Sequence, residues 1–138
     1  MTESEIDQAR ELVRRGWAEL RGERRAREYP HLPELISAVE PFSALSTLFP
    51  FLSVGRLCFS RFAPFPHYYV DFLVSFGRGV YAAEATLESG GWVRTTVLGR
   101  GSARDVVALL ASKIPADYGP ARLANAETDL SGMRNPLL

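Results

Sequence analysis

Residues 68–87 read YYVDFLVSFGRGVYAAEATL, and this stretch decides the fold class. Apolar side chains fill alternate positions from 68 to 76, so the segment has the period-two pattern of a β-strand. Gly77-Arg78-Gly79 then leads directly into a second apolar segment at 80–87. A short glycine-bearing connection between two such segments predicts an antiparallel hairpin rather than a parallel crossover.

Two further segments extend this hairpin to a four-stranded antiparallel meander. One strand is expected over 54–62, where Leu57 and Phe59 alternate with more polar positions. The loop that follows it, at 63–67, contains two prolines that prevent regular pairing. Another strand is expected over 92–98, because Ser89-Gly90-Gly91 provides a second tight connection.

Helices are predicted both before and after the meander in the sequence. Apolar residues recur at helical spacing from Ser4, a candidate cap, to about Tyr29, although Gly22 favours a break in that helix. A second, short helix is expected from Pro33. A third is expected over 102–114, because Asp105 follows Ser102 at the spacing of a capping box and Pro115 ends the helical pattern.

The predicted fold is therefore α+β, a two-layer sandwich of two N-terminal helices, a four-stranded antiparallel meander and a C-terminal helix. A chain of 138 residues fits one domain, which we place at residues 1–118. Residues 119–138 are polar, rich in small side chains and weakly periodic, so we expect an irregular tail there.

Composition excludes several classes of function. The formal net charge is zero, which disfavours nucleic acid and anionic membrane surfaces as partners. No apolar run is long enough to span a bilayer, and the N-terminus lacks a signal-peptide pattern. The single cysteine, Cys58, rules out an internal disulfide and suits a reducing compartment, so the sequence predicts a cytoplasmic protein.

The sheet is unusually apolar. All eight phenylalanines lie between Phe42 and Phe76, and Tyr69, Asp71 and Leu73 are expected on the face of their strand opposite Phe72. A sheet covered on one side only carries a cleaner polar face. Either both faces are covered, or an apolar surface remains for a ligand or a second subunit.

Asp71 is the outstanding polar residue of this apolar region. Aspartate is disfavoured within strands, and a buried carboxylate needs a partner, for which Arg56 and Arg61 are the nearest candidates. The pair is either a structural salt bridge or part of a site in which Asp71 acts as a general base or holds a cation.

His67 and Tyr69 lie close to Asp71 in the sequence. Imidazole has an ordinary pKa near neutral pH, so His67 is a candidate acid or base unless it is a solvated loop residue. These residues, together with nearby arginines and a further tyrosine, form a candidate site. The catalytic candidates are His67, Tyr69 and Asp71, and the ligand-binding candidates are Arg56, Arg61 and Tyr81.

Other chemistry is poorly supported by the sequence. Cys58 lies within a strand, where a cysteine is more often a core residue than a nucleophile. His31 and His67 are far apart and give no metal-ligand spacing, so no metal and no cofactor is expected. The loop Gly99-Arg100-Gly101-Ser102 lacks a nucleotide-binding pattern. The arginine-rich stretch at 21–28 is interleaved with glutamates and is typical of a solvated helix end.

The run Leu48-Phe49-Pro50-Phe51, followed by Phe59-Ser60-Arg61, resembles the signature of a small actinobacterial family of unknown function. The resemblance covers residues 42–121 and continues through Pro66, Asp71, Gly79, Tyr81, Leu98-Gly99 and Gly119-Pro120-Ala121. Members of that family are labelled natural-product-biosynthesis proteins. The resemblance implies a pathway setting and transfers no catalytic residue.

Three hypotheses follow. The first is a small accessory protein of natural-product biosynthesis that binds a small apolar molecule or a protein partner. The second is a cofactor-independent enzyme that performs acid–base or cyclisation chemistry on a pathway intermediate. The third is a structural subunit of a homo-oligomer, such as a homodimer, with the spare face of the sheet as its interface.

Overall fold

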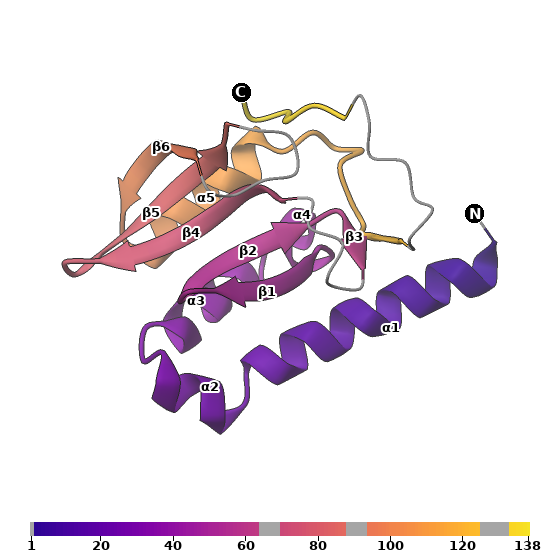
Figure 1. Ribbon diagram of the computed structural model, residues 1–138, viewed down its shortest axis with the longest axis horizontal. Coiled ribbons are helices and arrows are strands. Elements are labelled where there is room, and N and C mark those ends of the chain that lie inside the picture. The colour runs from indigo at the N-terminus through magenta and orange to yellow at the C-terminus, as the bar shows by residue number, and fades with distance from the viewer. Residues whose placement is uncertain (1, 64–69, 88–93, 125–132) are drawn as a thin grey trace.

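The computed structural model describes residues 2–63, 70–87, 94–124 and 133–138. Its centre is a five-stranded antiparallel sheet with the strand order β1-β2-β4-β5-β6. Figure 1 shows α5 running behind β4 and β5, and the long helix α1 running beside β1. The α+β class is thus confirmed. In chain order the elements are α1 (Glu3–Leu20), α2 (Glu23–Glu28), α3 (Leu32–Val39), α4 (Ser43–Ser46), β1 (Phe49–Ser53), β2 (Arg56–Ser60), β3 (Phe62–Ala63), β4 (Val70–Gly77), β5 (Val80–Thr86), β6 (Thr95–Gly101), α5 (Ala103–Lys113) and β7 (Arg122–Leu123).

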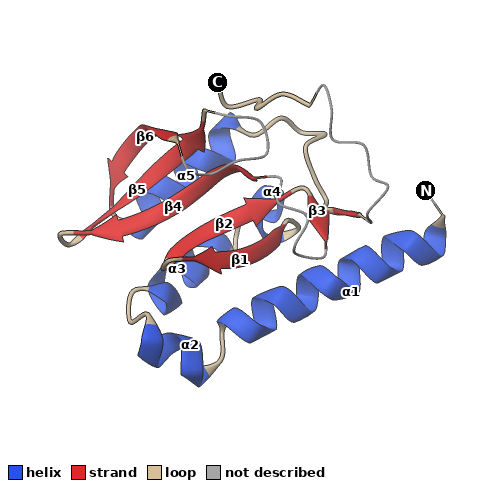
Figure 2. Ribbon diagram, in the orientation of Figure 1, coloured by secondary structure: helices blue, strands red, loops and turns tan. Residues whose placement is uncertain are grey.

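The N-terminal region contains four helices where two were expected (Figure 2). The first helix ends at Leu20 and a second begins after Gly22, so the predicted break is confirmed. The predicted cap at Ser4 is wrong, because the hydroxyl of Thr2 accepts the 3.1 Å hydrogen bond from the Glu5 amide.

The prediction of four strands is also wrong, because β1 adds a fifth at the edge of the sheet. Its sequence, FPFLS, does not alternate and contains Pro50, which an edge strand tolerates. The turn into β2 places both Val54 (φ 51°) and Gly55 (φ 77°) in the left-handed region. A β-branched residue is rare there, so the sequence does not have the usual appearance of a hairpin turn.

The hairpin predicted over residues 68–87 is confirmed. β4 and β5 pair from Phe72 to Gly77, and Arg78 (φ 54°) and Gly79 (φ 80°) form a turn whose twist matches that of the strands. The start of α5 is confirmed too, because the Ser102 hydroxyl accepts a 3.1 Å hydrogen bond from the Asp105 amide.

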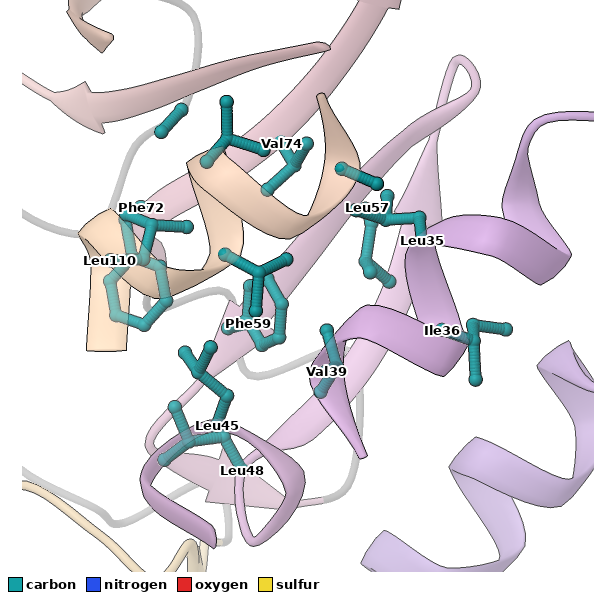
Figure 3. Packing of buried hydrophobic residues seen from close by; sticks show 14 of the residues in the cluster. Leu35, Ile36, Val39, Leu45, Leu48, Leu57, Phe59, Phe72, Val74 and Leu110 are labelled. Carbon is teal, nitrogen blue, oxygen red and sulfur yellow. The ribbon is translucent and has the colours of Figure 1, made fainter. Parts of the chain in front are cut away.

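The main core lies between the sheet and helices α3, α4 and α5. Figure 3 shows Phe59 and Phe72 from the sheet beside Leu110 of α5, with Leu45 and Leu48 nearby. The rings of Phe59 and Phe72 lie 5.2 Å apart, and both side chains are completely buried. Trp17 of α1 joins this cluster, so the first helix is part of the core.

The opposite face of the sheet holds a smaller apolar cluster. Cys58, Val70 and Leu73 form it, and all three are completely buried. Further along this face Glu84 accepts hydrogen bonds from the hydroxyl groups of Ser75 and Thr95. Among the described residues, the apolar side chains at the centre of this sheet face are therefore buried and do not form an exposed surface.

The expected irregular tail contains one ordered pairing. β7 runs parallel to β3, with Phe62 opposite Arg122. Residues 125–132 of that tail lie outside the described residues. Among the helices that the structure describes, none is long and apolar enough to cross a membrane.

Candidate ligand-binding site

Asp71 occupies a β-bulge at the start of β4. Phe59 of β2 lies opposite Phe72, whereas the next β2 residue, Ser60, lies opposite Val70, so Asp71 is the extra residue. The simple alternation expected along this strand is therefore interrupted. Asp71 was expected on the face opposite Phe72, but both side chains approach Tyr118, so this prediction is wrong.

The carboxylate of Asp71 is completely buried and has two partners. Arg61 Nη2 lies 2.8 Å from Asp71 Oδ2, and the Tyr118 hydroxyl donates a 2.5 Å hydrogen bond to the same oxygen. Burial raises the pKa of Asp71, while the hydrogen bond from Tyr118 and the charge of Arg61 act in the opposite direction. Of the two arginines proposed as partners, Arg61 is the one that binds it.

Further contacts join this pair to the C-terminal segment. The guanidinium of Arg61 lies 4.7 Å from the centre of the Tyr118 ring and donates to the carbonyl of Arg134. The Asn135 side chain donates to the carbonyl of Asp71 at 2.7 Å and to that of Thr86 at 2.9 Å. We call Asp71, Arg61, Tyr118 and Asn135 the Asp71 clamp, because their contacts fasten Tyr118 and residues 134–135 to the sheet.

The Asp71 clamp does not present a carboxylate to solvent. A pocket of about 280 Å³ lies beside it, and Arg61 and Tyr118 line that pocket. Asp71 is not one of the described residues that line this pocket. A general base must reach the proton that it removes, so the arrangement favours a positioning role for Asp71.

The remaining predicted site residues are dispersed. His67 and Tyr69 lie outside the described residues. Arg56 lies at the far end of β2, where its Nε donates to the Ser53 carbonyl. Tyr81 lies at the turn end of the β4–β5 hairpin, where its hydroxyl donates a 2.9 Å hydrogen bond to the His31 carbonyl. The structure thus brings together Asp71 and Arg61, and places Arg56 and Tyr81 elsewhere.

Cys58 was expected to be a core residue, and the reactivity of its thiol tests this expectation. Its thiol is completely buried, and burial raises its pKa to about 12. Because the thiolate is the reactive form, we expect iodoacetamide to leave Cys58 unmodified at neutral pH in the native protein and to alkylate it quantitatively in urea. Mass spectrometry measures both results, and rapid alkylation of the native protein would contradict them.

A larger cavity of about 620 Å³ lies between α1 and the segment that follows Tyr118. We call it the α1 groove. It is lined by Ile6, Arg10, Val13, Arg14, Trp17 and Arg21 of α1, by Ser46 and Thr47, and by residues 119–122. Its volume lies within the usual range for small-molecule sites.

The floor of the α1 groove is apolar. Trp17 is 4% exposed, and its indole nitrogen donates a 3.1 Å hydrogen bond to the Leu48 carbonyl. The polar end of this side chain is therefore satisfied, and its ring offers an apolar surface. Val13, one turn earlier, is 8% exposed, and Ile6 lies at the open end.

The second side of the α1 groove is held by backbone contacts. The amide of Ala121 donates to the Thr47 carbonyl, and the amide of Arg122 donates to the carbonyl of Arg61. A Cβ at Gly119 would lie 3.1 Å from the side chain of Leu48, so glycine allows a close approach there. The Asp71 clamp holds Tyr118, immediately before this segment, and so positions this side of the groove.

The lining of the α1 groove is strongly cationic. It contains four arginines, and none of the described lining residues is an aspartate or a glutamate. Three of these arginines have carboxylate partners outside the lining, namely Asp7, Glu11 and Glu40. The fourth, Arg122, lies on the opposite side of the groove and is exposed.

The pairing of Arg14 with Glu11 is close enough to lower the pKa of Glu11 to about 2, chiefly through the hydrogen bond from Arg14. The Asp7–Arg10 pair is looser, at 3.9 Å. Arg10 and Arg122 are therefore the better candidates for contacting an anionic group, since an exposed and weakly paired guanidinium loses little when it changes partner.

Sequence reasoning missed the α1 groove. Its helical side was visible as a pattern, because Arg10, Arg14 and Arg21 follow the same helical face as Val13 and Trp17. The basic residues considered from the sequence were those at 21–28, of which Arg21 is among the described lining residues of the groove and Arg24, Arg25 and Arg27 are not. The other side of the groove comes from the segment expected to be an irregular tail, and no local pattern joins it to α1.

Metal chemistry receives no support from the described part of the chain, where no group of three His, Cys, Asp or Glu residues could hold an ion.

The family model of DUF6193, a family of unknown function, matches residues 11–125. The chain belongs to DUF6193. No curated protein and no solved structure matches it. The match to DUF6193 includes Trp17 and residues 119–122, and so both sides of the α1 groove.

Proposed function

We propose that this member of DUF6193 is an accessory protein of natural-product biosynthesis that binds a small acid with an apolar body. The observation that carries the proposal is the α1 groove, in which arginines surround an apolar floor and no carboxylate belongs to the described lining. Guanidinium groups bind carboxylates and phosphates well, and the apolar floor would hold the body of the ligand.

The pathway setting comes from the resemblance of residues 42–121 to proteins that carry this label. A reducing cytoplasm suits the buried, reduced Cys58. Binding rather than catalysis is proposed because the described lining of the groove contains no histidine, aspartate or glutamate that could act as a general acid or base. The ligand would be an intermediate that the protein carries or presents to an enzyme.

We expect 2-naphthoate to bind in the α1 groove and 2-naphthamide, its neutral counterpart, to bind at least tenfold more weakly. Arg122→Ala should reduce the affinity for 2-naphthoate by about tenfold, which corresponds to about 1.4 kcal/mol, because one charge-assisted hydrogen bond is lost. Titration calorimetry on the full chain measures both affinities.

Arg100→Ala is the matched control, since Arg100 is exposed on β6 and does not line the α1 groove. It should leave the affinity unchanged. Equal affinity for the acid and the amide, or equal losses in the two arginine variants, would count against the proposal.

A further inference from the structure

Another cavity, of about 660 Å³, lies where the β4–β5 hairpin meets the start of α3 and the end of β6. We call it the hairpin pocket. The side chains that give it its character are His31, Glu34, Phe76, Val80 and Tyr81. It shares no lining residue with the α1 groove.

Three rings are packed together at this pocket. His31 and Phe76 are stacked with ring centres 4.7 Å apart and 13° between their planes. Tyr81 lies 4.7 Å from Phe76 at an angle of 51°. Even so, Phe76 and Val80 each remain 41% exposed. Two neighbouring exposed apolar side chains at a cavity often mark a surface that a ligand covers.

The charge of the hairpin pocket is opposite to that of the α1 groove. Glu34 is the one ionisable acidic or basic side chain, apart from His31 and Tyr81, among its described lining residues. The Tyr81 hydroxyl lies 3.1 Å from Glu34 Oε2 and 2.9 Å from the His31 carbonyl, so it helps to hold the carboxylate in place. The carboxylate of Glu34 therefore offers a contact for a cation.

Tyr81 is suited to holding this carboxylate rather than to proton transfer. Burial and the neighbouring Glu34 together raise the pKa of Tyr81 to about 12. The hydroxyl therefore stays protonated at neutral pH and continues to donate a hydrogen bond. A general base works best with a pKa near the operating pH, so the pocket favours binding over acid–base catalysis.

We propose that the hairpin pocket binds a small organic cation, a protonated or alkylated amine, between the carboxylate of Glu34 and the ring of Phe76. The face of an aromatic ring attracts a cation through its quadrupole, and Phe76 remains 41% exposed although His31 is stacked against its ring. Val80 supplies an apolar contact for the alkyl groups. This site is separate from the proposed acid-binding site and does not depend on it.

Choline and 3,3-dimethylbutan-1-ol, its neutral counterpart of the same shape, provide the test. In NMR titrations of the full chain, choline is expected to shift the amide signals of Gly79, Val80 and Gly101, and the alcohol to shift them much less. Glu34→Gln removes the charge but keeps an acceptor for Tyr81, and should weaken choline binding about 2- to 5-fold. Phe76→Leu should weaken it by a similar factor of about 2 to 5.

Glu3→Gln is the matched control, because Glu3 is an exposed glutamate in the first turn of α1 and should leave the choline affinity unchanged. Circular dichroism checks that each variant is folded. Glu34→Gln alters an exposed side chain, so this variant keeps the test valid even if Phe76→Leu does not fold. The proposal is overturned if the alcohol binds as tightly as choline, if choline does not bind, if its shifts map away from the hairpin, or if Glu34→Gln has no effect.

Discussion

Asp71→Ala is expected to lower the free energy of unfolding by about 3 to 5 kcal/mol, the usual cost of removing one partner from a buried ion pair. The carboxylate of Asp71 binds both the guanidinium of Arg61 and the hydroxyl of Tyr118 in a site without solvent access. Alanine would leave a largely buried cation and a buried hydroxyl without this partner. Urea denaturation monitored by circular dichroism measures the loss.

The matched control is Asp117→Ala, which removes an exposed carboxylate from the residue next to Tyr118. Its effect should lie within about 0.5 kcal/mol of zero, as is usual for surface positions. Asp71→Ala should also weaken binding of 2-naphthoate, because Tyr118 precedes the side of the α1 groove that contains Arg122. A loss of stability no larger than that of the control would show that the Asp71 clamp contributes little to the fold.

The dependence of this effect on pH follows from the direction of the pKa shift. Burial raises the pKa of Asp71 in the folded protein, so the neutral carboxyl is the form that folding favours. Its contribution is complete below the ordinary pKa of aspartate and is lost as the pH rises through the higher folded-state pKa. The stability advantage of the natural protein over Asp71→Asn should therefore shrink from acid to neutral pH. An advantage that grows over that range would mean that the pairing with Arg61 outweighs burial.

Phe59→Ala is expected to cause a second large loss, about 3 to 5 kcal/mol, because the structure cannot close the space left by a buried ring. Phe59 is completely buried, with its ring centre 5.2 Å from Phe72 and 6.1 Å from Trp17. Its contact with Trp17 therefore joins the sheet to α1. Scanning calorimetry should show a midpoint lowered by about 10 °C or more for a chain of this length.

Phe76→Ala is the comparison for Phe59→Ala, since it makes the same change at a side chain that is 41% exposed. Less apolar area returns to water there, so its loss should be clearly smaller. If the two substitutions had the same effect, Phe59 would not be the centre of the core that its contacts indicate.

Much of the fold could be predicted from short stretches of sequence. The β4–β5 hairpin follows from two period-two segments and the glycines of its turn, and the start of α5 follows from Ser102 and Asp105. β1 could not be predicted in the same way. Its apolar run does not alternate, and its turn uses Val54 at a backbone conformation that valine rarely adopts.

The candidate site shows the same division more sharply. Sequence reasoning identified Asp71 and proposed Arg61 as one of two partners, because a carboxylate within an apolar strand needs one. It could not find Tyr118 or Asn135, which lie 47 and 64 residues further along the chain. It also placed Asp71 on the other face of the sheet, since a bulge shifts the alternation by one residue without leaving a local pattern.

The sequence by itself determined the α+β class, the central hairpin and the last helix with its N-terminal cap. It also determined that Asp71 lies within an apolar strand. These features depend on local periodicity and turn chemistry, which neighbouring residues encode. The tertiary structure alone decided the fifth strand, the partners of Asp71 and the two cavities of opposite charge. Each of these forms between segments distant in the chain, whose meeting depends on packing of the whole core rather than on any single stretch.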